Sequence, residues 1–245
     1  MNKVFEQFDG LSTDELSNLA TQYEYSEEYE KAAECLIKAS ETGDLLATYD
    51  LARYYEQGKG VKQDFVKAAE LYMIVSECRK PLVFADSDMP LTPQCDAEYA
   101  VGCFYEKGLL ANSSMEKAIE WYLRAADDGS YEACFKMARL HFDGIGVAQD
   151  YDESARYLYD GYGDRRSGDS ESFNLALNLI GKTTSYEAAI LEIIGDCYTM
   201  GLGIEKNDAM AVEYYKQANL LNSEAKIAMR MHYTDTQNDY GEWPF

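Results

Sequence analysis

Glycine pairs of the kind found in phosphate-binding loops occur in two similar stretches of the sequence. Residues 141–150 read HFDGIGVAQD, and residues 55–64 read YEQGKGVKQD. A phosphate-binding loop places glycine N–H groups around the phosphate and follows them with Lys and then Ser or Thr. The GKG at 58–60 lacks this following pair, so we expect no nucleotide and no other cofactor here.

A cysteine nucleophile is a second possible chemistry. Cys134 and His141 lie seven residues apart, which places them two helical turns apart and on one face of a helix. An imidazole beside a thiol can activate it as a nucleophile. His141 nevertheless stands where related segments carry a packing Tyr, so core packing explains the pair better. A zinc site has little support, because the cysteines form no Cys-x-x-Cys pair and the two histidines are far apart in sequence.

Calcium binding is weakly suggested by DTQNDYGE at 235–242 and by FADSD at 84–88. In the first stretch the glycine falls one position late, and the chain ends before a Glu that could close the site. The second stretch is equally weak. Since the sequence also offers no converging acid, base and nucleophile, we expect no catalytic or metal-binding residues and no enzymatic activity.

The charge balance limits the kinds of partner. The chain has 44 acidic and 22 basic side chains, a formal net charge of −22 at neutral pH. Nucleic acids and anionic membranes should repel such a surface, whereas a basic protein is permitted. Acidity that merely keeps the surface soluble is the alternative. No stretch approaches the ~18 apolar residues of a membrane helix and the N-terminus lacks an apolar signal segment, so we expect a cytoplasmic protein.

The two glycine-rich stretches belong to an internal repeat. Four segments align without gaps: ATYDLARYYEQGKGVKQD from Ala47, AEYAVGCFYEKGLLANSS from Ala97, ACFKMARLHFDGIGVAQD from Ala133 and ILEIIGDCYTMGLGIEKN from Ile190. In each, a glycine is followed six residues later by Asp, Ser or Asn, the types that open helices. We therefore expect these glycines to end one helix and the polar residue to begin the next. The predicted turn glycines are Gly58, Gly60, Gly108, Gly144, Gly146, Gly201 and Gly203, and the predicted N-caps are Asp64, Ser114, Asp150 and Asn207.

The second helices of these pairs repeat as well. KAAELY (67–72), KAIEWY (117–122), ESARYL (153–158) and MAVEYY (210–215) share one offset from the turn. A small residue in each allows helices to approach closely, and one turn later comes a large residue that we expect to be buried. The glycines are thus explained by antiparallel helix pairs.

These residues resemble the Sel-one-like repeat (SLR) family, a branch of the tetratricopeptide-like α-solenoids. The family pattern A-x-x-x-L-G-x-x-Y-x-x-G-x-G-V, followed by D and K-A-x-x-W-Y-x-K-A-A-x-x-G, is nearly met from Ala97, where AEYAVGCFYEKG leads to MEKAIEWYLRAADDG. The resemblance implies an all-α, right-handed α-solenoid of antiparallel helix pairs. It also implies a non-enzymatic scaffold, adaptor or inhibitor role.

We expect residues 1–245 to form a single α-solenoid domain. The predicted repeats are 18–44, 47–78, 97–130, 133–162 and 190–222. Two insertions, 79–95 and 163–185, interrupt the period, the first as an extended loop and the second with an extra helix near 171–180. The last predicted helices are 207–221 and 223–233, the latter within a C-terminal cap and tail, 223–245.

A solenoid binds partners on the concave surface lined by its first helices. Positions that lie away from the packed stripe of these helices are the candidates for contact with a protein or peptide. They are Tyr49, Asp50, Arg53, Glu56, Gln57, Tyr99, Cys103, Lys107, Lys136, Arg139, Asp143, Glu192, Asp196 and Met200. We expect the cations among them to make the groove locally less negative; a merely solvated helix face is the alternative.

Two functions remain open from the sequence. The first is an intracellular adaptor that binds client proteins. The second is an immunity or inhibitor protein that neutralises a basic toxin or enzyme, for which a net charge of −22 would speed the encounter. The sequence does not indicate the oligomeric state.

Overall fold

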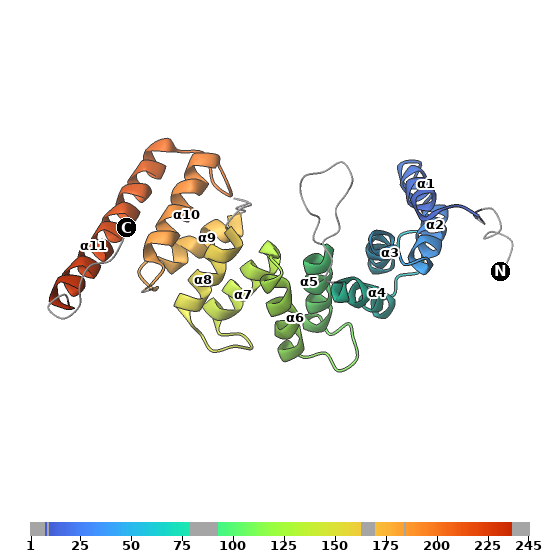
Figure 1. Cartoon of the computed structure of the whole chain (residues 1–245), viewed down its shortest axis with the longest axis horizontal. Helices are drawn as coiled ribbons and strands as arrows, with labels where there is room; N and C mark the ends of the chain where they lie inside the picture. Colours follow the sequence, from blue (N-terminus) through green and yellow to red (C-terminus); the bar gives the residue numbers. More distant parts are fainter. Residues whose placement is uncertain (1–7, 9, 79–92, 163–169, 184, 237–245) are drawn as a thin grey trace. The chain divides into compact units, whose positions relative to one another are not determined.

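The computed structural model describes residues 8, 10–78, 93–162, 170–183 and 185–236 of the chain, with side chains described up to residue 222. Within these ranges it contains eleven helices and no strand (Figure 1). The helices are α1 (Thr13–Tyr25), α2 (Tyr29–Glu41), α3 (Leu45–Gln57), α4 (Phe65–Glu77), α5 (Pro93–Glu106), α6 (Met115–Asp127), α7 (Tyr131–Asp143), α8 (Tyr151–Tyr162), α9 (Ser170–Leu179), α10 (Glu187–Met200) and α11 (Asp208–Thr236). The all-α fold class is therefore confirmed.

The chain divides into two compact units, Met1–Cys134 and Phe135–Phe245. In the first unit, α1 packs on α2, α3 on α4 and α5 on α6, and each pair is joined to the next through the α2–α3 and α4–α5 contacts. Helices α3 and α5, the first members of successive pairs, also contact each other. In the second unit, α10 packs on α9 and α11, and α8 contacts α9 and α10.

The turns between paired helices are built as their residue types predict. Gly58 ends α3 in the left-handed conformation, and its N–H donates to the Tyr54 carbonyl. The Asp64 side chain opens α4 by accepting from the N–H groups of Val66 and Lys67, both at 3.1 Å. Equivalent side-chain caps are formed by Ser114, Asp150 and Asn207. These interactions pair helix-terminal N–H groups that would otherwise lack an intrahelical partner.

Close approach within a pair depends on small residues facing large ones. A methyl group on Gly102 would lie 2.6 Å from the Tyr122 ring, and one on Gly195 would lie 2.7 Å from the Tyr215 ring. Tyr72, Tyr122 and Leu158 are buried at the equivalent position of the second helices. The first unit's core continues along α1 to α5 through buried Ala, Leu, Val and Phe side chains.

The structure differs from the sequence predictions at two helix ends. Helix α5 begins at Pro93, within the predicted extended insertion 79–95, since proline is compatible with the first turn of a helix. The break predicted near residue 222 is wrong, because α11 continues from Asp208 to Thr236 with neither Pro nor Gly to interrupt it. The extra helix predicted near 171–180 is present as α9.

Several predicted features fall outside the described residues. They include 79–92 of the first insertion with the FADSD stretch, 163–169 of the second insertion, and residues 237–245 of the tail. In the part of the chain that the structure does describe, no helix combines the length and the apolar character needed to cross a membrane.

Candidate protein-binding surface

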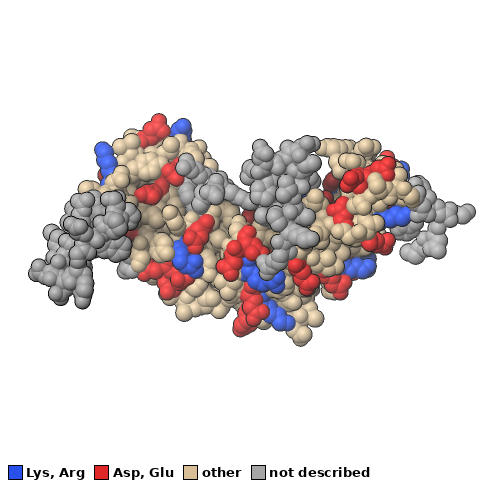
Figure 2. All heavy atoms as spheres, viewed as in Figure 1, with Lys and Arg blue, Asp and Glu red and all other residues tan. Residues whose placement is uncertain are grey.

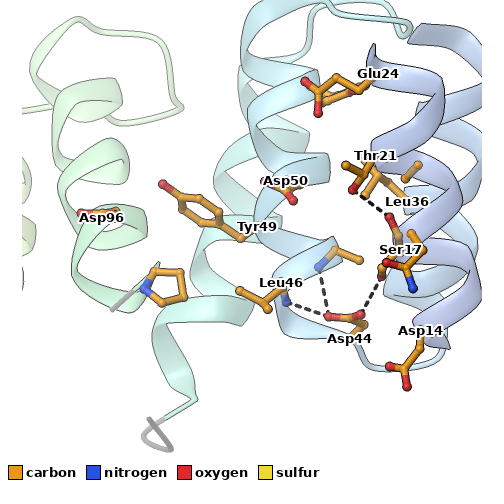
Figure 3. A pocket seen from close by; sticks show the side chains of 15 residues that line it. Asp14, Ser17, Thr21, Glu24, Leu36, Asp44, Leu46, Tyr49, Asp50 and Asp96 are labelled. Atoms are coloured by element: carbon orange, nitrogen blue, oxygen red, sulfur yellow. Dashed lines mark hydrogen bonds between the residues drawn. The ribbon is translucent and has the colours of Figure 1, made fainter. Parts of the chain in front are cut away.

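The first unit contains a cavity of about 620 Å³ between α1, α3 and α5 (Figure 3). Helix α1 lines it with Asp14, Ser17, Asn18, Ala20, Thr21 and Glu24, and α3 with Leu46, Ala47, Tyr49, Asp50 and Tyr54. Asp44, Leu36, Pro93 and Asp96 complete the lining. Two predicted contact residues, Tyr49 and Asp50, thus face a cavity that α1 closes on its other side.

The cavity lining is acidic. None of its lining residues within the described ranges is basic. Five carboxylates line it: Asp14, Glu24, Asp44, Asp50 and Asp96. Arg53, which we expected to make the groove less negative, does not line the cavity; its guanidinium lies 3.6 Å from Asp50 with about half of the side chain exposed. The expectation of a less negative groove is therefore wrong at this cavity.

Two of these carboxylates have partners that fix the local structure. Asp44 caps α3 by accepting from the Leu46 N–H at 2.9 Å and the Ala47 N–H at 3.1 Å, and it accepts from the Ser17 hydroxyl at 3.0 Å (Figure 3). Glu24 pairs with the ammonium of Lys59, which comes from the α3–α4 turn. Asp44 and Glu24 therefore tie α1 to the next helix pair while still contributing negative charge.

Burial shifts the ionisation of the groups on α3. The pKa of the Asp50 carboxyl is raised by its removal from water, an effect that the neighbouring Arg53 partly offsets. The pKa of Tyr49 is raised to about 12, chiefly by burial and then by the charge of Asp96 on α5. The Tyr49 hydroxyl is consequently protonated at neutral pH and can donate a hydrogen bond next to carboxylates from two helices.

The inner helices repeat one arrangement of tyrosine and carboxylate. The Tyr49 ring lies against the Tyr72 ring with centroids 5.6 Å apart, and the Tyr72 hydroxyl donates to Glu56 at 2.8 Å. One repeat later, the Tyr99 ring lies 5.5 Å from the Tyr122 ring. The Tyr122 hydroxyl donates to Glu106 at 2.7 Å and to the Cys103 sulfur at 3.6 Å.

This arrangement gives the predicted residues of α3 and α5 different roles. Tyr99 and Cys103 are half-buried and contribute to packing, whereas Gln57 and Lys107 are exposed at the ends of α3 and α5. Glu56 belongs to the predicted set and Glu106 does not, although the two have the same spacing from Tyr72 and Tyr122 in the sequence. The contribution of α1 was also missed, because α1 precedes the four segments that align.

In the second unit, the predicted residues engage neighbours on their own helix or on its paired helix. Arg139 pairs with Asp143 at 3.3 Å, and Asp196 accepts from the Tyr215 hydroxyl. Lys136 is half-buried on α7, and Met200 is exposed at the end of α10.

The residues considered for catalysis are accounted for by packing. The His141 ring stacks on Tyr157 with centroids 5.6 Å apart and planes 19° from parallel, and Cys134 is buried. Among the described residues, no group of three or more His, Cys, Asp or Glu side chains is placed to hold a metal ion.

Comparison with known proteins identifies the repeat. The family model described as Sel1 repeat matches residues 18–44, 45–72, 95–130, 132–160 and 193–223, which together make up more than half of the chain. A protective antigen of uropathogenic Escherichia coli displaying an SLR fold is 20% identical over 84% of this chain, with a TM-score of 0.58. This chain covers 45% of the antigen's length.

Two further solved structures are similar to this chain. A Sel1 repeat protein from Oxalobacter formigenes is 20% identical, with 87% of this chain and 76% of that protein covered and a TM-score of 0.54. An immunity protein from Pseudomonas aeruginosa is 16% identical, with 84% and 81% covered, but its TM-score of 0.33 is too low to support an argument. The first two similarities confirm the repeat fold at identities too low to transfer a function.

Proposed function

The chain belongs to the Sel1 repeat family, and from this we propose that it is a non-enzymatic scaffold that binds a protein or peptide partner on the inner faces of its first helices. Proteins of this family are generally protein–protein interaction scaffolds. The raised pKa values of Tyr49 on α3, Tyr72 on α4 and Tyr122 on α6 follow from burial and from the neighbouring carboxylates, so they do not require a catalytic role.

The observation that carries this proposal is the cavity of the first unit. It joins α1, α3 and α5, which are the first helices of three successive pairs, and about 620 Å³ is in the range of ligand-binding pockets. Solenoids present such surfaces to extended segments, because each pair adds a similar strip of side chains. The partner-contacting set therefore extends from the predicted α3 and α5 residues to include α1.

Steric blocking of the inner face tests the proposal. We would introduce Arg53→Trp and Lys107→Trp, which place bulk at exposed positions on α3 and directly after α5, and compare Glu70→Trp and Glu120→Trp on the second helices, α4 and α6. Each variant is used to capture partners from the source cells. Loss of the same partner with the first pair alone supports the proposal, and equal capture by all variants contradicts it.

A neutraliser of a basic protein is the second candidate, favoured by the net charge of −22 and the acidic cavity. Acidic side chains outnumber basic ones on the face shown in Figure 2. Association with a basic protein should then be fast at low salt and slow steeply as salt screens the charges. One-to-one capture of a single cationic protein with this salt dependence favours the neutraliser; several partners with weak salt dependence favour the adaptor.

The same charge argument leads us to propose that nucleic acids and membranes are not partners. The six cysteines are free thiols in the structure, the state that a reducing cytoplasm maintains, and we propose that compartment.

A further inference from the structure

We infer that the cavity between α1, α3 and α5 binds an arginine side chain from an extended, basic segment of the partner protein. This inference rests on the proposed function and specifies the chemistry of the segment that the inner face would hold. It combines three observations: the partly open cavity, the sign of the charges around it, and the aromatic rings in its wall.

The cavity provides both room and charge for a cationic side chain. Asp14 on α1, Asp50 on α3 and Asp96 on α5 all belong to its lining (Figure 3). Arg53 offsets part of the charge of Asp50, while Asp14 and Asp44 add further negative charge to the lining. A guest carrying positive charge is complementary to such a lining, and a carboxylate-bearing guest would be repelled.

The aromatic wall favours arginine among the cationic side chains. Tyr49 and Tyr54 both line the cavity, and Figure 3 shows the Tyr49 ring extending from α3 towards the helix that carries Asp96. A planar guanidinium can stack on such a ring while its N–H groups pair with carboxylates, whereas an ammonium is a compact, strongly hydrated point charge.

The protein uses this combination of groups for its own cations. At the edge of the cavity, the Lys59 ammonium lies 4.5 Å from the Tyr29 ring centroid and 5.2 Å from that of Tyr54, and it pairs with Glu24. On α6, the Arg124 guanidinium lies 4.4 Å from the Trp121 ring and 3.0 Å from Glu98. Tyr49 with Asp50 and Asp96 offers the same ring and carboxylates to a side chain entering the cavity.

A comparison of two peptides of matched shape but different charge, made on the full chain, tests the inference. The probe is a fluorescent, acetylated and amidated decapeptide with arginine and glycine alternating, and its control carries citrulline, the neutral isostere, at each arginine. We expect the arginine peptide to bind and the citrulline peptide to bind at least tenfold more weakly, as measured by fluorescence anisotropy at about 150 mM salt.

Two triple variants separate the site from the general field of the protein. The first variant combines Asp14→Asn, Asp50→Asn and Asp96→Asn. It should bind the arginine peptide about tenfold more weakly than the unmodified chain does. Glu70→Gln with Glu77→Gln and Glu120→Gln removes the same charge from exposed positions of α4 and α6, and should change affinity by less than about twofold. Equal losses in both variants, equal binding of the two peptides, or no binding to the unmodified chain would overturn the inference.

A second measurement does not depend on the variants folding. An arginine peptide with a central spin label should broaden the amide signals of Tyr49 and Asp50 in the unmodified chain more than those of α4 and α6. Broadening confined to α4 and α6 would contradict the inference. If the inner tryptophan variants lose their partner while the arginine peptide fails to bind, only this inference fails; if they retain the partner, the proposed function itself fails.

Discussion

A single glycine determines how closely the α3–α4 turn approaches the first helix pair. A methyl group on Gly60 would lie 2.1 Å from the carbonyl oxygen of Tyr29, and the residue has a φ of +65°. A side chain here would collide with backbone atoms, which cannot rotate away as a flexible side chain can. The second glycine of the turn is thus needed for packing between repeats.

Replacing Gly60 should destabilise the fold more than replacing a glycine that has a positive φ but no close neighbour. Gly108 has a φ of +72°, and a methyl group added to it would meet nothing within 4 Å, so Gly108→Ala should lower the free energy of unfolding by roughly 1–2 kcal/mol. Gly60→Ala should lower it by a further 1–3 kcal/mol or so, because the backbone must also shift. Urea denaturation of the two variants measures this, and equal losses would contradict the close approach.

Buried tyrosines should make the fold sensitive to alkali. The pKa of Tyr49 and that of Tyr54 are raised to about 12, mainly by burial, and burial with a carboxylate partner raises those of Tyr72 and Tyr122 as well. The unfolded chain loses these protons near pH 10, its ordinary phenol pKa, while the folded chain retains them. The stabilisation is therefore complete below about pH 10 and is lost as the pH rises towards about 12.

Two measurements check this pH dependence. The free energy of unfolding from urea titrations should fall between about pH 10 and pH 12, and phenolate absorbance should show a group of tyrosines that ionise late. Tyr49→Phe should remove one late ionisation. Ionisation of every tyrosine near pH 10 with the fold intact would contradict the burial of these hydroxyls.

At the scale of the elements, the second insertion is fastened to the repeat that precedes it. One oxygen of Asp152, in the first turn of α8, accepts from the Thr183 hydroxyl at 2.6 Å and from the Ser185 N–H at 3.0 Å. The Lys182 ammonium lies 4.6 Å from the Phe142 ring centroid. These contacts hold the connection between α9 and α10 against the start of α8 and the end of α7.

Removing the carboxylate should loosen this connection without unfolding the helices. Asp152→Ala deletes two charge-assisted hydrogen bonds, so the Ser185 amide should exchange with solvent at least about tenfold faster. Glu153→Ala is the matched control, because the neighbouring Glu153 pairs with Arg156 instead. Unchanged exchange at Ser185, or equal acceleration in both variants, would show that Asp152 does not hold the connection.

The ends of the helices were predictable where they depend on residues that are close together in the sequence. Asp64 and Asp150 could be recognised as helix starts because an N-cap depends on the two or three residues that follow it. The start of α5 at Pro93 and the length of α11 were not predicted, since the repeat period suggested boundaries that no strong breaking residue enforces at those points. Repeat periodicity therefore located the pairs better than it located their ends.

The candidate site was less predictable, because it is made by residues distant in sequence. Tyr49 and Asp50 followed from helical geometry, but Asp14 and Asp96 join them only through the packing of three helix pairs. Arg53 lies on the exposed face of α3, yet it forms an ion pair with Asp50 and does not line the cavity. The sign of the charge at the cavity could not be inferred from one helix at a time.

At the scale of the whole molecule, the single domain 1–245 remains a prediction. Repeat arrays are stabilised by contacts between neighbours, so an uninterrupted array of this length should unfold cooperatively. We expect one calorimetric transition, with the calorimetric enthalpy equal to the van't Hoff enthalpy. Two separated transitions, one for each compact unit, would contradict the prediction.

The central claim is that a protein partner lies on the first helices of the pairs, and site-specific photo-crosslinking tests it most directly. A photoreactive phenylalanine analogue would replace Arg53 on α3 or Lys107 directly after α5, and Glu70 or Glu120 on α4 and α6, in the full chain with its captured partner. Crosslinks to the partner from the first two positions, with few from the other two, are the predicted result. Crosslinks from Glu70 and Glu120 alone would contradict it.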